Sequence, residues 1–298
     1  MKLHTYLIGI LAAGSVVASA DPLGGATNFN VFTTGNFSSQ YSDTEGKIAA
    51  GGDVNLDGYS VGLQNQGGTG LVAGKSLHFT NGTVYGTANY GTTDYVANAT
   101  INGQVSSNGS NPGATLGSPV DFATVGTFLK KTSTFWSGLA QTGTVSDYYG
   151  QLHLDGGSGV QVFDITASQL QNATEVDLHV NSGATVLINV SGTSVGFKNY
   201  GYNYTGADSS HVLWNLYGAT TASYSSLSGS VLAMGADITT DYGAINGQVL
   251  AKSISGHSQI NWHQFTGAIP AAPVPEPATI AALGLGALGL IRRRKTTR

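Results

Sequence analysis

Two short runs of acidic and glycine residues have the spacing of calcium-binding loops. The run 53–58 (Asp-Val-Asn-Leu-Asp-Gly) places oxygen ligands at alternate positions before a glycine, as in the first half of such a loop. The twelfth position holds Gln64, so the bidentate glutamate is missing. The run 155–159 (Asp-Gly-Gly-Ser-Gly) is similar to a calcium-binding nonapeptide, but one copy cannot build that fold. We therefore predict polar turns at both places and no metal site.

A serine in the run 192–196 (Gly-Thr-Ser-Val-Gly) matches the string of a hydrolase nucleophile elbow. An elbow needs a helix directly after the serine, and the residues that follow show no helical pattern. Paired carboxylates for sugar hydrolysis cannot be recognised either, because the body has only Glu45 and Glu175 beside scattered Asp. The seven His show no H-x-x-H or H-x-H spacing. We predict no catalytic residues, no cofactor and no enzyme activity.

Three tyrosines alternate with small and polar residues late in the chain, at Tyr200, Tyr202 and Tyr204. Alternation places all three rings on one face of a strand, where flat aromatic surfaces can contact a glycan. The alternative is an aromatic patch that packs beneath a loop. These tyrosines are the predicted glycan contact, with the packing alternative left open.

The elements that must position such residues are predicted from short repeats. Glycine accounts for 43 of the 298 residues, and short β-branched runs recur between the glycines, as strands recur between turns. Four similar units begin at Gly46, Gly70, Gly229 and Gly247, and the starts within each pair lie 24 and 18 residues apart. That length suits one coil of a β-solenoid. We predict a mostly β, β-solenoid-like (β-helix) domain; the alternative is a β-sandwich of ordinary hairpins.

One amphipathic α-helix is predicted at about 120–140, because apolar residues recur at helical spacing from Phe122 to Leu139 and Asp121 marks the first turn. Repeat units lie on both sides of this helix, so we expect one domain whose distant parts stack together. Strand-like runs that follow the helix are interpreted as a three-strand insertion that bridges the halves. These runs are 159–165, 175–180 and 185–190.

The charge of the chain is concentrated at its C-terminus, since all four Arg lie at 292 or beyond. Residues 21–277 contain six Lys and all 16 Asp and Glu, which gives a net charge of 6 − 16 = −10. An acidic body without Arg argues against nucleic acid and against anionic lipid as partners. The chain also has no Cys, so its stability depends on its core and its hydrogen bonds.

The N-terminus has the layout of a secretory signal peptide. Lys2 gives a polar start, an apolar run follows at 6–17, and Ala18 and Ala20 form a small-x-small cleavage site. The apolar run is shorter than the roughly 17–25 residues of a transmembrane helix. We therefore predict that residues 1–20 are removed after export.

A proline-rich turn, an apolar run and a basic cluster follow one another in the C-terminal segment 270–298. The apolar run, 278–291, would span about 21 Å as a helix, less than the roughly 30 Å hydrocarbon core. This order resembles the PEP-CTERM sorting signal of bacteria. The resemblance implies recognition and processing by an exosortase. The short apolar run by itself predicts transient anchoring in the inner membrane by a C-terminal helix, with the arginines on the cytoplasmic side. The residues of the signal are Pro275, Glu276, Pro277, Arg292, Arg293 and Arg294.

Several runs within the body, 21–269, share the pattern of one family. The most specific run is 45–52 (Glu-Gly-Lys-Ile-Ala-Ala-Gly-Gly), and the units at Gly229 and Gly247 continue the pattern. The body thus resembles the choice-of-anchor A domain of bacterial surface proteins, although Met234 stands where that family has Pro. The resemblance implies a surface or matrix role, adhesive in character, and no reaction.

Together these features predict an exported protein of the bacterial cell surface or extracellular matrix, adhesive or associated with exopolysaccharide. Its expected partners are an exosortase, the membrane through the C-terminal helix, and exopolysaccharide or other surface glycans. Two alternatives stay open: a carbohydrate-active β-solenoid enzyme that acts on exopolysaccharide, and a matrix component without a specific ligand.

Overall fold

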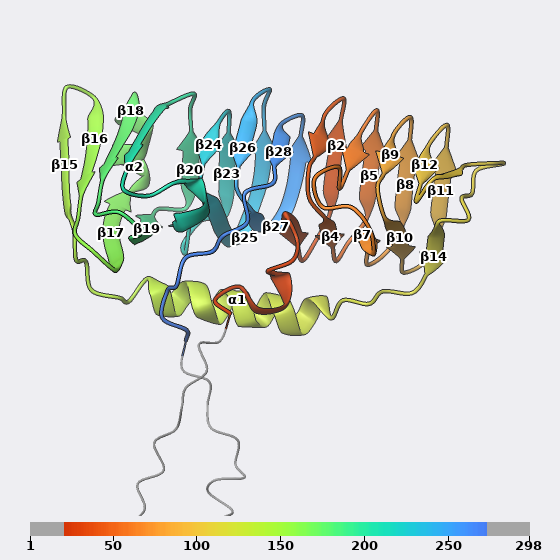
Figure 1. Ribbon diagram of the computed structural model, residues 1–298, viewed down its shortest axis with the longest axis horizontal. Coiled ribbons are helices and arrows are strands. Elements are labelled where there is room, and N and C mark those ends of the chain that lie inside the picture. The colour runs from red at the N-terminus through yellow and green to blue at the C-terminus, as the bar shows by residue number, and fades with distance from the viewer. Residues whose placement is uncertain (1–20, 273–298) are drawn as a thin grey trace, which may run out of the picture.

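Short strands separated by glycine turns wind into a β-solenoid in the computed structural model, which describes residues 21–272 (Figure 1). The signal peptide predicted at 1–20 and the membrane helix predicted at 278–291 lie outside the described residues. Within the described part, no helix has the length and apolar character needed to cross a membrane. The solenoid has three faces of mainly parallel strands, and the first two faces belong to one continuous 16-stranded sheet.

The first face, the helix face, is covered by helix α1 (Phe122–Trp136). Its central strands are buried on both sides, because their inward side chains fill the solenoid and their outward side chains contact α1. Leu129 and Trp136 of α1 cluster there with Phe32 and Leu213. In spatial order the strands are β17 (Val160–Thr166), β19 (Thr185–Ser191), β22 (Val212–Asn215), β25 (Ser230–Thr240), β27 (Val249–Gly256), β1 (Val31–Thr33), β4 (Ile48–Ala50), β7 (Thr69–Ala73), β10 (Thr87–Tyr90) and β14 (Ala114–Leu116).

The second face, the polar face, is joined to the helix face through the long strands β25 and β27, which contribute to both. Burial alternates along its strands, so that Val54 and Leu56 point into the core and Asn55 between them points outward. Its other strands are β20 (Ser194–Phe197), β23 (Thr221–Tyr224), β2 (Phe37–Gln40), β5 (Val54–Asp57), β8 (Leu77–Thr80) and β11 (Asp94–Ala97).

The third face consists of shorter strands and completes the triangular cross-section of the solenoid. It comprises β24 (Leu227–Ser228), β26 (Ala244–Asn246), β28 (Gln259–Asn261), β3 (Asp43–Thr44), β6 (Ser60–Val61), β9 (Thr83–Val84), β12 (Thr100–Ile101) and the antiparallel β13 (Gln104–Val105). A smaller sheet lies at the end of the solenoid opposite to β13 and β14, with β15 antiparallel at its edge. It comprises β15 (Thr144–Tyr148), β16 (Gln151–Asp155), β18 (Glu175–His179) and β21 (Gly201–Thr205).

The coils do not stack in chain order. Strand β1 lies between β27 and β4, with Val31 in register with both Val249 and Ile48. The chain therefore begins in the middle of the solenoid and builds coils to one end. Helix α1 then runs back along the helix face to the other end of the solenoid. The later coils stack from that end towards β1 (Figure 1).

This architecture confirms the predicted solenoid and the stacking of distant parts, and it excludes the β-sandwich alternative. Helix α1 is shorter than the predicted 120–140 and begins after Asp121, whose carboxylate accepts a hydrogen bond from the Thr124 N–H. The predicted three-strand insertion is wrong, because β17, β18 and β19 are coils of the solenoid itself. The remaining short elements are α2 (Ala167–Asn172), η1 (Gly24–Ala26) and η2 (Ser209–His211).

Candidate functional site

Outward side chains of the polar face form straight rows, because neighbouring strands are in register. Adjacent strands lie about 4.8 Å apart, so a row across seven strands presents hydrogen-bonding groups over roughly 29 Å. The central row consists of Ser223, Thr239, Ser255, Ser38, Asn55, His78 and Tyr95.

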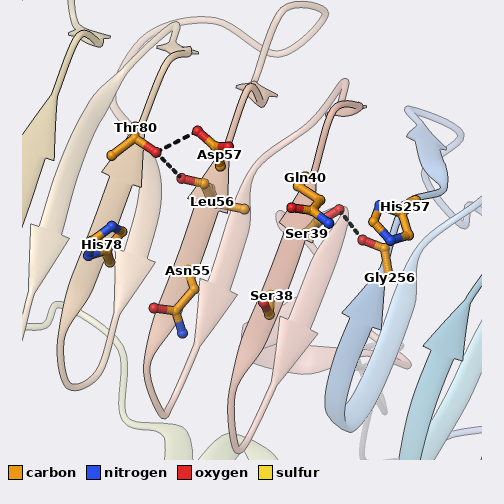
Figure 2. A pocket seen from close by; sticks show the side chains of 10 residues that line it. All are labelled: Ser38, Ser39, Gln40, Asn55, Leu56, Asp57, His78, Thr80, Gly256 and His257. Atoms are coloured by element: carbon orange, nitrogen blue, oxygen red, sulfur yellow. Dashed lines mark hydrogen bonds between the residues drawn. The ribbon is translucent and has the colours of Figure 1, made fainter.

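The polar face is hollowed where the row crosses β27, β2, β5 and β8 (Figure 2). This hollow has a volume of about 520 Å³. A second hollow of about 420 Å³ shares Ser38 and Asn55 with the first and extends to Asp237 and Lys252. We call the two together the groove. The lining of the first hollow is Ser38, Ser39, Gln40, Asn55, Leu56, Asp57, His78, Thr80, Gly256 and His257.

The two carboxylates of the groove are both held in the ionised form. Asp57 accepts hydrogen bonds from the Thr80 hydroxyl at 2.6 Å and the Asn81 amide at 2.7 Å, and these bonds lower its pKa. Asp237 accepts from the Lys252 ammonium at 2.7 Å, and this contact lowers the pKa of Asp237. Neither group is therefore prepared to donate a proton near neutral pH.

Exposed tyrosine rings flank the groove on both sides. Tyr95 stacks on His78 with ring centroids 4.9 Å apart, and Tyr242 stacks on His257 at 5.2 Å. The rings of Tyr95 and Tyr242 are 49% and 77% exposed. Tyr41, which follows β2, is 72% exposed. Both imidazoles line the groove, so each stacked tyrosine lies next to a residue of its lining.

The tyrosines singled out in the sequence lie elsewhere, on and just before β21. Their rings do share one face of the strand, but Tyr200 is buried and the other two pack against the core. The hydroxyl of Tyr204 donates to the Ser228 carbonyl at 2.8 Å, and that of Tyr202 to the Ser226 carbonyl at 3.1 Å. This placement corresponds to the packing alternative, and these rings do not line the groove.

The other sequence motifs have structural roles in the solenoid. The run 53–58 is strand β5 and its turns, and Asp53 accepts a hydrogen bond from the Ser76 N–H of the next coil. In the run 155–159, the Gln161 side chain accepts a hydrogen bond from the Gly157 N–H, which holds the turn. Among residues 21–272, no group of three or more His, Cys, Asp or Glu is placed to hold a metal ion. Ser194 lies in the extended strand β20 and not at an elbow.

Sequence reasoning missed the groove because its residues are isolated polar side chains on different coils. Asn55 and His78 are adjacent only through strand pairing, and Ser255 reaches Ser38 from 217 residues away along the chain. The one available signal was the alternation within each strand, which separates inward from outward positions. It does not show which coils become neighbours.

The fold and the groove define a β-solenoid with a lateral helix and one polar, hollowed face. The chain belongs to the family described as "Putative Ice-binding-like adhesive domain", whose model matches residues 22–262. A second model, the PEP-CTERM protein-sorting motif, matches residues 273–295 and confirms the predicted sorting signal. This motif implies export, surface sorting and processing by an exosortase.

Three solved structures to which this chain is similar are distant from it in sequence. An ice-binding protein from the Antarctic ascomycete Antarctomyces psychrotrophicus is 18% identical, with 84% of this chain and 99% of that chain covered and a TM-score of 0.46. A glycosylated ice-binding protein from an Arctic yeast is 15% identical, with 87% and 98% covered and a TM-score of 0.38. The DUF3494 domain of ice-binding protein 1 from Shewanella frigidimarina is 11% identical, with 81% and 95% covered and a TM-score of 0.36. A comparison with curated proteins gives no match.

Proposed function

We propose that this protein is an adhesin of the bacterial cell surface or extracellular matrix, and that the groove binds surface glycans such as exopolysaccharide. In this proposal the signal peptide at 1–20 directs export, and the 270–298 segment anchors the protein in the inner membrane until an exosortase processes it. The choice-of-anchor A assignment of the body, 21–269, is part of the same proposal.

The observation that carries the proposal is the groove on the polar face. It is long, open to solvent and lined by hydroxyl, amide and carboxylate groups, with exposed aromatic rings at both sides. Sugars present hydroxyl groups around a ring with apolar faces, so hydrogen-bonding side chains and flat aromatic rings are the matching chemistry.

The place where residues 270–272 leave the domain supports an accessible groove in the anchored protein. The Trp136 indole N–H, at the end of α1, donates to the Pro270 carbonyl at 2.8 Å, and Ala272 lies beside Lys131 and Phe135 of the same helix. The chain thus leaves the described domain at α1, which covers the helix face. The groove is on a different face of the solenoid.

An enzyme is the less favoured proposal, although the groove holds two Asp and one Lys. Asp237 and Asp57 lie on β25 and β5, which are three strand spacings apart, or at least about 14 Å. Glycoside hydrolases place their two carboxyl groups only about 5–9.5 Å apart. The lowered pKa of Asp57 also opposes a role as general acid.

Ice binding is a second candidate, favoured by the hydroxyl groups at one end of the central row. Ser223, Thr239 and Ser255 continue in register to Ser38, which gives a regular array of small hydroxyls. Beyond Ser38 the array is replaced by larger amide, imidazole and phenol groups over a hollow, which suits a polymer chain better than a flat crystal plane.

The test compares mature protein with a variant whose groove is blocked. Asn55→Trp places an indole in the groove, and Asn203→Trp, outward on β21, is the matched control. In affinity electrophoresis through gels that contain exopolysaccharide from an exosortase-bearing host, we expect retardation of the wild type and control only. Equal retardation of Asn55→Trp removes the groove from the binding site. Thermal hysteresis without retardation supports ice binding instead.

A further inference from the structure

We infer that the groove selects an uncharged polysaccharide and holds it as an extended chain parallel to the solenoid axis, with sugar rings on Tyr95 and Tyr242. This inference rests on the proposed glycan-binding function and specifies its ligand. It follows from the charge of the groove, from the kind of polar groups that line it, and from where its aromatic rings lie.

The charge of the domain opposes an acidic ligand. Residues 21–272 contain six Lys, no Arg and 15 Asp and Glu, which gives 6 − 15 = −9. Inside the groove the Lys252 ammonium is paired with Asp237 at 2.7 Å, and the Asp57 carboxylate is ionised and held by neutral partners. The groove thus carries about one net negative charge, which repels uronate and sulfate groups.

The lining matches neutral hydroxyl groups. The side chains of Ser38, Gln40 and Asn55 can each donate and accept hydrogen bonds, and they point outward from adjacent strands into the groove (Figure 2). A sugar hydroxyl likewise donates and accepts hydrogen bonds, so these side chains can bind it either as donors or as acceptors. The carboxylate of Asp57 adds an acceptor, which in sugar recognition accepts from hydroxyl groups.

The aromatic rings set the direction of the chain. Tyr242 follows β25 and Tyr95 lies on β11, so the two rings are separated by five strand spacings, roughly 24 Å along the axis. The groove lies between them and crosses the strands. Each ring is fixed by stacking on a histidine, which orients it without burying it. Such a length fits several sugar rings in a row and not a monosaccharide.

The experiment separates the uncharged and acidic fractions of the host exopolysaccharide by anion exchange. Each fraction is cast into gels, and retardation of the mature protein is measured at low and high salt. We expect at least tenfold tighter binding to the uncharged fraction, with little salt dependence because no ion pairs form. Preferential binding to the acidic fraction overturns the inference but leaves the adhesin proposal standing. Binding to neither fraction overturns both.

Two variants and one control test the aromatic rings. Tyr95→Ala and Tyr242→Ala each remove one exposed ring, and Tyr149→Ala removes a ring that is 97% exposed on the β15–β16 turn. We expect each groove variant to weaken binding to the uncharged fraction at least fivefold, and the control to leave it unchanged. Thermal melts should be unaltered in all three, since none of these rings is buried. Unchanged binding by both groove variants would show that the rings do not hold the chain.

Discussion

The side-chain nitrogen of Gln248 donates a 2.7 Å hydrogen bond to the carbonyl oxygen of Phe29, 219 residues earlier in the chain. The same nitrogen donates to the Thr27 carbonyl at 2.7 Å, and the amide oxygen of Gln248 accepts from the Phe265 N–H at 2.9 Å. Gln248 is fully buried. One side chain therefore connects both ends of the described chain at the seam where β1 meets β27.

We predict that Gln248→Leu strongly destabilises the domain. The substitution leaves the Phe29 carbonyl and the Phe265 N–H without a partner and removes one of the two donors to the Thr27 carbonyl, so we expect a loss of about 2–4 kcal/mol in the free energy of unfolding. Urea unfolding followed by circular dichroism measures it. Gln104→Leu on the exposed strand β13 is the control and should change the value by less than about 0.5 kcal/mol. A comparable loss in both variants would contradict the role of the seam.

Close stacking of the coils predicts a second sensitive position, Gly82. A Cβ added there would meet the Tyr59 carbonyl oxygen of the neighbouring coil and the Phe79 ring. We expect Gly82→Ala to cost about 1–3 kcal/mol through overpacking, which lowers the melting temperature by several degrees. At Gly157 an added Cβ has ordinary van der Waals contact only, so Gly157→Ala should leave the melting temperature almost unchanged. Equal melting temperatures for the two variants would argue against the close coil contact.

The solenoid could be predicted because each coil repeats a local pattern. The units at Gly46 and Gly70 become the adjacent strands β4 and β7, and those at Gly229 and Gly247 become β25 and β27. Repeats on both sides of the helix predicted that distant parts stack, but not how they pair, because no local signal specifies that Val31 meets Val249. The same limit produced the wrong interpretation of β17 to β19 as an insertion.

The site was predicted less well than the fold, for a related reason. Alternation predicts one shared face for the tyrosine rings on and just before β21, but periodicity alone does not say whether that face is inside or outside. Which face of β21 points outward depends on the sheet that the strand joins. By contrast, the exposed rings of Tyr95 and Tyr242 belong to isolated tyrosines that no spacing distinguishes.

Tyrosines whose hydroxyl groups are buried predict a loss of stability at alkaline pH. Burial raises the pKa of four hydroxyl groups, whereas in the unfolded chain each titrates near pH 10. Because the folded-state pKa is the higher one, the unfolded chain releases these protons first. The contribution to stability is complete below about pH 10 and is lost as the pH rises further. The four residues are Tyr59, Tyr202, Tyr204 and Tyr224.

Tyrosinate absorbance and circular dichroism, recorded together from pH 8 to pH 12, test this expectation. The four buried hydroxyl groups should ionise only as the β signal is lost. Tyr59→Phe, which removes a hydroxyl bonded to Thr44 at 2.7 Å, should reduce the alkaline loss while lowering stability near neutral pH. Ionisation of all tyrosines near pH 10 with the fold intact would contradict the buried assignment.

The sorting motif predicts how the mature protein is made. We expect the secreted wild type to begin at Asp21 and to lack the cluster from Arg292 onward, and intact mass spectrometry of the native-host product measures both ends. Replacement of Pro275, Glu276 and Pro277 by Ala should leave the protein in the inner membrane with its tail, because the exosortase no longer recognises it.

A control for this change lies just beyond the matched motif, at Thr296 and Thr297. Replacement of both by Ala should leave processing and location as in the wild type, because neither residue belongs to residues 273–295. If the wild type keeps Arg298 and stays in the membrane, the tail acts as a permanent anchor. The groove would then bind glycans from a fixed position on the membrane and not as part of a released matrix.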